Sequence, residues 1–128
     1  MGCYHYGWGA ILPALIIRYV IGFRESDDLQ KDQFILAPAL PSSLFRPGHT
    51  YGLSNLRYRQ TRTDVLYEVK DDGKIMIRLT CRLLSTGRVM VKNEAGQMMA
   101  QTTGSVRVAE LSFEGINGTL YTITIERG

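Results

Sequence analysis

Cysteine, histidine and tryptophan are scarce in this chain of 128 residues, which contains two, two and one of them respectively. Cys3 and Cys81 lie far apart and belong to no Cys-x-x-Cys or Cys/His cluster, so no metal or redox motif can be identified. His5 and His49 have no serine or cysteine motif beside them, and no catalytic triad is indicated. We therefore expect no cofactor and no metal, and the sequence identifies no catalytic residue.

An excess of one charge is also lacking, because 15 basic residues face 12 acidic ones and leave a net charge of +3. This mild excess does not by itself indicate nucleic acid as a partner. The densest basic cluster is Arg57-Tyr58-Arg59 with Arg62. On a strand Arg57 and Arg59 share one face and Tyr58 takes the other, so the ring and the cations cannot bind bases together. We expect a polar sheet face here that docks on a neighbouring domain, and no nucleic-acid partner.

No uninterrupted apolar run reaches the ~20 residues that a membrane-spanning helix needs. The most apolar segment, residues 7–23, contains Pro13 and Arg18, and no positively charged region precedes it as in a signal peptide. Two thiols without an evident partner favour a reducing compartment. The sequence thus predicts a cytoplasmic protein outside the membrane. A small membrane-associated protein anchored by this segment is the less favoured alternative.

The apolar segment is predicted to form a helix from about residue 10 to residue 22. Pro13 is tolerated in a first helical turn, and Arg18 is the only charged residue before the predicted end. A helix that is apolar on every side is buried in a larger protein or in a membrane. The sheet that follows can cover only one side of it. We therefore expect the chain to be a fragment of a larger protein or an obligate assembly partner, with self-association through the helix as one possibility.

From residue 51 onward, apolar residues alternate with a period of two, which is typical of strands. Turn signals at residues 71–74, 85–87, 93–96 and 117–118 divide this part into short strands. Asn117-Gly118 is expected to form a type I′ turn. A phase shift before Leu111 predicts a bulge. The fold class is therefore mainly β: an antiparallel β-sandwich of about six to eight strands preceded by one apolar α-helix.

Three motifs together resemble a known enzyme family. They are residues 6–12 (YGWGAIL), residues 34–41 (FILAPALP) and residues 52–59 (GLSNLRYR). They resemble, in order, the aromatic-Gly-Trp segment that opens the last barrel helix, the stretch that leaves the barrel, and the strand pair that follows in six-hairpin (α/α)-toroid glycoside hydrolases. That family includes trehalase, processing-glucosidase and mannosylglycerate-hydrolase-like enzymes. The resemblance covers most of residues 4–70.

The resemblance implies that residues 1–28 are the terminal helix of a missing α-toroid domain and that residues 29–128 are the C-terminal β-sandwich domain closing it. The catalytic acid and base of such enzymes lie upstream of the aromatic-Gly-Trp segment, so the chain alone is expected to be inactive. Tyr6 and Trp8 carry over as substrate-lining residues whose rings suit a sugar face. The implied partners are carbohydrate, through the parent enzyme, and the toroid itself. The alternative is a free-standing β-sandwich module for carbohydrate binding or assembly.

Overall fold

The computed structural model describes residues 21–25, 32–43, 46–59, 61–71 and 73–127. The substrate-lining candidates Tyr6 and Trp8 lie outside this part of the chain, as does the predicted helix apart from its last two residues, Ile21 and Gly22. Within the described part, no helix is long and apolar enough to cross a membrane.

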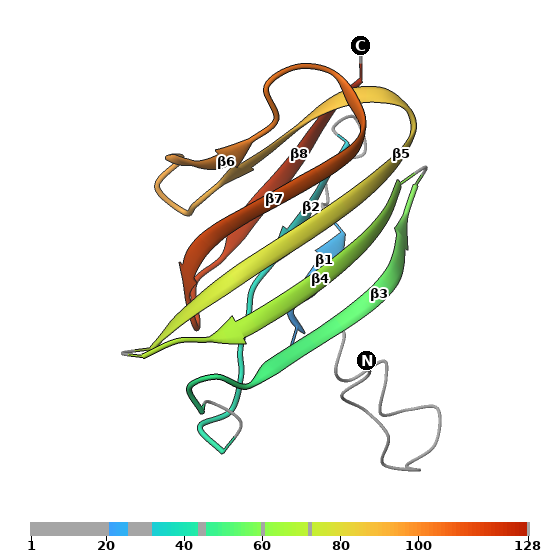
Figure 1. Cartoon of the computed structure of the whole chain (residues 1–128). Helices are drawn as coiled ribbons and strands as arrows, with labels where there is room; N and C mark the ends of the chain where they lie inside the picture. The colour runs from blue at the N-terminus through green and yellow to red at the C-terminus, as the bar shows by residue number, and fades with distance from the viewer. Residues whose placement is uncertain (1–20, 26–31, 44–45, 60, 72, 128) are drawn as a thin grey trace.

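The described residues form eight antiparallel strands that belong to a single sheet (Figure 1). In chain order they are β1 (Phe23–Glu25), β2 (Gln33–Leu36), β3 (Thr50–Tyr58), β4 (Thr61–Val69), β5 (Lys74–Lys92), β6 (Met98–Gln101), β7 (Val106–Ile116) and β8 (Tyr121–Arg127). The prediction of a mainly β, antiparallel fold is therefore confirmed. The path of hydrogen-bonded neighbours runs β1-β2-β8-β5-β4-β3, with β6 and β7 paired to β5.

β5 joins the two halves of the sheet. Its first part lies between β4 and β7, with pairs that run from Val69↔Ile75 to Thr61↔Leu83 on the β4 side. Its last part pairs with β8 and with β6 instead. In Figure 1 the half made of β3, β4, β5 and β7 lies in front of β8, β2 and β1. The sandwich prediction is thus corrected in one respect, because the two layers are halves of one curled sheet that approaches a barrel.

Apolar side chains from both layers fill the space between them. Phe34 of β2 lies with its ring centroid 5.8 Å from that of Tyr58, although β2 and β3 are not hydrogen-bonded neighbours. Phe23 of β1 approaches the same tyrosine at 6.4 Å. At the other side of the core, Phe113 and Tyr121 pack edge to face at 5.2 Å. These aromatic contacts hold the layers together where no backbone ladder connects them.

Two predicted turns differ from the structure. Residues 85–87 do not reverse the chain, because they lie inside β5, where its partner changes from β4 to β8. The register against β7 shifts at this point, between Arg82 and Gly87 of β5. The bulge predicted before Leu111 is absent, because the pairing of β7 with β5 is continuous from Val108 to Ile116. In the turn at 117–118 only Gly118 has a positive φ, of 89°. A type I′ turn needs positive φ at both central residues, so that assignment is wrong.

The turn differs from type I′ because the side chain of Asn117 makes hydrogen bonds to a distant part of the chain. Its side chain accepts a hydrogen bond from the backbone N–H of Leu40 at 2.8 Å and donates one to the carbonyl of the same residue at 2.9 Å. These two bonds hold the proline-rich stretch after β2 against the end of β7. The amide that the Asn-Gly-Thr glycosylation pattern would modify is therefore engaged in the fold.

The sheet begins before residue 29, since Phe23–Glu25 pair with β2 in the register Phe23↔Leu36. The two residues before β1 are held firmly. Ile21 is fully buried, and its carbonyl accepts a hydrogen bond from the hydroxyl of Tyr67. The carbonyl of Gly22 accepts a hydrogen bond from the N–H of Ala37 at 3.0 Å. The chain therefore enters the sheet through the core rather than along its surface.

Candidate functional site

The outer face of β3, β4, β5 and β7 carries most of the charged side chains that the sequence places on strands. In β4, burial alternates residue by residue, so that Val65, Tyr67 and Val69 point into the core. Asp64 and Glu68 consequently point outward, beside outward residues of β5 such as Arg78. This is the alternation that the sequence predicts for a half-buried strand. The two ends of the face differ in how their charges are balanced.

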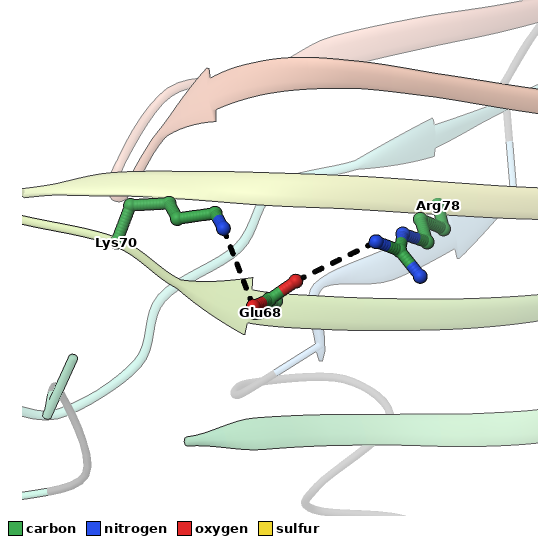
Figure 2. Close-up of polar contacts among 3 residues, drawn as sticks. All are labelled: Glu68, Lys70 and Arg78. Atoms are coloured by element: carbon green, nitrogen blue, oxygen red, sulfur yellow. Dashed lines mark hydrogen bonds and ion pairs between the residues drawn. The ribbon is translucent and has the colours of Figure 1, made fainter. Parts of the chain in front are cut away.

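At the end near the β4–β5 turn, the charges are paired, and we call this the paired end. The carboxylate of Glu68 lies between two cations, 3.2 Å from Nζ of Lys70 and 3.6 Å from a guanidinium nitrogen of Arg78 (Figure 2). Lys74 and Glu114 form a further pair at 3.7 Å across β5 and β7. Pairs of this kind between exposed side chains contribute little stability each. Every cation of the paired end lies beside a carboxylate, although three cations share two carboxylates and leave a net charge of +1.

At the opposite end, three arginines occupy adjacent positions on three strands, and we call them the arginine row. Arg57 of β3 lies opposite Arg62 of β4, and Arg62 lies opposite Arg82 of β5. Directly opposed residues of antiparallel strands have Cα atoms about 4.5–5.5 Å apart, and like charges in this arrangement are destabilising. Among the described residues, neither Arg57 nor Arg62 forms an ion pair.

Arg82 is the member of the row whose positive charge lies beside a carboxylate. Its guanidinium lies 2.8 Å from a carboxylate oxygen of Asp64, and this contact raises the pKa of Arg82. The other Asp64 oxygen accepts the backbone N–H of Asn55 at 2.8 Å, at a bulge in β3 where Asn55 has a φ of 64°. The hydrogen bonds from Arg82 and Asn55 hold the pKa of Asp64 below its usual value. Glu110 of β7 adds a second negative charge near Arg82.

A hollow of about 390 Å³ lies at the arginine row. It is lined by residues of the β3–β4 hairpin and of β5: Arg57, Arg59, Thr61, Arg62, Arg82, Leu83 and Leu84. Tyr58 points into the core and is 3% exposed, as the alternation predicts. The guanidinium carbon of Arg59 lies 5.3 Å from the centroid of the Tyr58 ring, within the range of a cation–π contact. The planar donors of guanidinium groups match the oxygens of carboxylates and phosphates, so the hollow suits an anion.

A second hollow, of about 600 Å³, lies on the outer side of the other layer. Its lining comes from β2, β5, β8 and the β5–β6 turn and includes both signs of charge as well as hydroxyl and amide groups. Among these are Lys92, Glu94, Thr122 and Thr124. Glu94 is partly committed to the fold, because it accepts the backbone N–H of Leu120 at 2.9 Å. The mixture of neutral and charged donors and acceptors is compatible with a polyhydroxylated ligand.

Cys81 is the thiol in the described part of the chain, and its surroundings are those of a core residue. Cys81 is buried, and burial raises the pKa of its thiol to about 11, so it stays protonated near neutral pH. It accepts a long hydrogen bond of 3.8 Å from the hydroxyl of Thr63. Among the described residues, no three His, Cys, Asp or Glu side chains gather as they would around a metal ion.

The structure extends the basic cluster that the sequence indicated. Arg57, Arg59 and Arg62 do line one hollow, but Arg82, which completes it, lies 20 residues further along the chain. The signal for Arg82 was the Asp-Gly turn, since counting along both strands from Val69↔Ile75 places Arg62 opposite Arg82. The docking of this face on a neighbouring domain stays a prediction.

The fold and its surface define a small antiparallel β-domain with one region of paired charges and one arginine-rich region on its outer face. Comparison with models of protein families, with curated proteins and with solved structures found no match to this chain.

Proposed function

We propose that this chain supplies a structural β-domain, not catalytic by itself, that closes the catalytic α-toroid of a glycoside hydrolase. In this role the domain holds the end of the apolar segment that precedes it. The family resemblance of the sequence motifs motivates the choice of parent enzyme. The observation that supports the structural role is the way in which the sheet encloses Ile21 and Gly22.

The entry point is held from both layers of the sheet. From one layer, the buried Tyr67 of β4 donates its hydroxyl hydrogen to the carbonyl of Ile21. From the other, the N–H of Ala37 donates to the carbonyl of Gly22. Gly22 has a φ of +78°, and a Cβ at this position would lie 2.0 Å from the carbonyl oxygen of Ala37. Only glycine fits such a close approach, so the chain is fixed in both position and direction at the point where it leaves the apolar segment.

This arrangement supports the role of a closing domain because it fixes the orientation of the preceding segment relative to the sheet. A segment joined to the sheet only by a surface loop could take many orientations relative to the sheet. A backbone that emerges from the core with its last carbonyls bonded to β4 and to the stretch after β2 has far fewer. The expected inactivity of the chain alone follows from the parent enzyme's acid and base, which the resemblance puts upstream of residue 6.

The test is to sequence the coding DNA upstream of residue 1, express the longest continuous reading frame, and compare it with the 128-residue chain on aryl glycosides. We expect the longer product to release sugar and the 128-residue chain to release none. Turnover by the 128-residue chain at an ordinary enzymatic rate of ~1–1000 per second would contradict the proposal. A stop codon directly upstream, together with a monomeric and stably folded chain, would also overturn it.

A free-standing carbohydrate-binding module is the second candidate, and the polar hollow over β8 favours it. Its threonines and mixed charges offer hydrogen bonds to neutral sugar hydroxyls. Titration with neutral oligosaccharides would test it. Saturable binding that a Thr122→Val, Thr124→Val variant loses supports this candidate, and the absence of binding removes it.

A further inference from the structure

We propose that the arginine row and its hollow bind a phosphate monoester dianion carried by a small molecule. This inference is independent of the structural role proposed above, because it concerns the outer face of the sheet rather than its core. It begins from an exception in the charge pattern of that face.

Elsewhere on the same face, cations lie beside carboxylates. Lys70 and Arg78 share the carboxylate of Glu68, and Lys74 pairs with Glu114. At the row, by contrast, Arg57 directly opposes Arg62, and neither forms an ion pair among the described residues. Placing like charges opposite each other costs stability. A cost of this kind is relieved when an anion occupies the space between the cations.

The number of cations indicates how much charge the anion carries. Arg82 already donates to the carboxylate of Asp64. A carboxylate, with one negative charge and two oxygens, thus compensates one arginine of the row. Arg57 and Arg62 have no ion-pair partner in the described part of the chain, and Arg59 lines the same hollow. A phosphate monoester carries ≈ −1.5 to −2 charge at pH 7 and three acceptor oxygens, so it can accept hydrogen bonds from two or three guanidinium groups at once.

The shape of the site favours a small molecule over a nucleic acid. The hollow of about 390 Å³ has the size of a small-ligand pocket. Surfaces that bind single-stranded nucleic acids usually combine cations with exposed aromatic rings, whereas Tyr58, the aromatic residue between Arg57 and Arg59, is buried. Leu84 lines the hollow and is 63% exposed, which provides an apolar surface for the carbon skeleton of a ligand.

The experiment uses the full chain with inorganic phosphate and glucose 6-phosphate as probes, at an ionic strength kept constant with chloride. Binding is followed through the arginine Nε–Hε resonances in ¹⁵N-resolved spectra and through the melting temperature. We expect saturable shifts of the row's resonances, with a Kd in the range of about 1 mM or tighter. Glucose 6-phosphate should bind more tightly than inorganic phosphate because its sugar also contacts the hollow.

Two variants give the test its specificity. Arg57→Gln combined with Arg62→Gln should weaken binding at least tenfold, and its own melting temperature should not fall, because it removes a like-charge contact. Arg78→Gln is the matched control, since it removes an arginine from the same face of β5 whose guanidinium already lies 3.6 Å from the carboxylate of Glu68. Its affinity should change by less than twofold.

Three results would overturn the proposal. Shifts that rise linearly without saturation would indicate only a counter-ion atmosphere. Equal losses in the double variant and in Arg78→Gln would show a general effect of net charge. Binding of a single-stranded oligonucleotide with no binding of glucose 6-phosphate would assign the row to nucleic acid instead.

Discussion

The paired end, on β4, β5 and β7, and the arginine row, on β3, β4 and β5, lie on the same outer face of the sheet, yet their charged side chains are arranged in opposite ways. At the paired end, Glu68 lies between Lys70 and Arg78 (Figure 2). At the row, Arg57 and Arg62 face each other without a carboxylate between them. Both ends keep the same alternation of inward and outward residues, but at the row a bulge in β3 determines which residue lies opposite Arg62.

The inner sides of the two ends differ as well. Behind the paired end, the hydroxyl of Tyr67 makes a hydrogen bond to the carbonyl of Ile21. Behind the row, the buried hydroxyl of Thr63 donates a long hydrogen bond of 3.8 Å to the sulfur of Cys81, its one partner among the described residues. The comparison indicates that the paired end is built for stability, whereas the row gives up some stability. Regions that give up stability in this way are often those that bind a ligand.

The largest expected effect is at the inner side of the paired end. Gly22→Ala should lower the free energy of unfolding by about 3 kcal/mol or more, because it combines a positive φ with a clash against the backbone. Gly73→Ala is the matched control, since Gly73 has a similar φ of +77° with no atom within 4 Å of the added Cβ. Urea unfolding measures both. Equal losses would mean that the close approach of Gly22 to Ala37 is unimportant.

The second prediction compares the loss of the buried hydroxyl behind the paired end with the loss of the one behind the row. Tyr67→Phe leaves the buried carbonyl of Ile21 without its donor and should cost about 1–3 kcal/mol. Thr63→Val removes a hydroxyl whose partner is a weak acceptor, and the change should stay within about 0.5 kcal/mol. Thermal or urea unfolding of the two variants gives the comparison. A larger loss for Thr63→Val than for Tyr67→Phe would reverse the assignment of the stable end.

Asp64 is the carboxylate that limits the charge of the row, and its removal is the third prediction. Its pKa lies below the ordinary 3.8 because of Arg82 and the N–H of Asn55. A lowered folded-state pKa means that the stabilisation is complete above pH 3.8 and is lost as the pH falls through the folded-state value. Asp64→Asn should therefore cost about 1 kcal/mol at neutral pH.

Two further measurements sharpen the Asp64 prediction. As the pH decreases below 3.8, the free energy of unfolding of the variant should fall less steeply than that of the wild-type chain, since the titrating group is gone. It should also bind phosphate more tightly than the wild-type chain, because Arg82 is released to the row. If the free energy of unfolding depended on acidic pH in the same way in both chains, the carboxylate of Asp64 would not be stabilised by its neighbours.

The smallest effects are of opposite sign at the two ends. Arg57→Gln should raise the free energy of unfolding by about 0.2–0.5 kcal/mol by removing a like-charge contact. Arg78→Gln should lower it by about 0.2–0.5 kcal/mol by breaking an exposed ion pair. Both should fade in about 0.5 M salt, where exposed charges are screened. Melting temperatures at low and high salt would check this, and changes of the same sign would remove the distinction between the ends.

Much of β4 and β5 could be predicted from the alternation of apolar and charged residues. Val65, Tyr67 and Val69 point inward as expected, and so do Ile75 and Ile77 on the partner strand. The chain turns between these strands as expected, with Gly73 at a φ of 77°. Such features are local, because the pleat sets which side chains share a face and the turn sets which residues oppose each other.

The arginine row could be predicted only in part. Arg57, Arg59 and Arg62 are close in sequence and were recognised as a cluster, whereas Arg82 joins them through strand pairing. The bulge at Asn55 was not foreseen, although it determines which residue of β3 lies opposite Arg62. Its φ of 64° is held by the carboxylate of Asp64, a contact between strands that no pattern in β3 alone reveals.

The sequence by itself determined the class of the fold, the inward and outward faces of its strands, and the turns at Gly73 and Gly96. The tertiary structure decided that residues 85–87 continue β5 instead of reversing it, and that Asn117 holds Leu40 instead of forming a type I′ turn. A Ser-Thr-Gly segment fits either a turn or a bend in a long strand. The choice depends on which distant strand offers hydrogen bonds and a core to cover, and for β5 that strand is β8, more than 30 residues further along the chain.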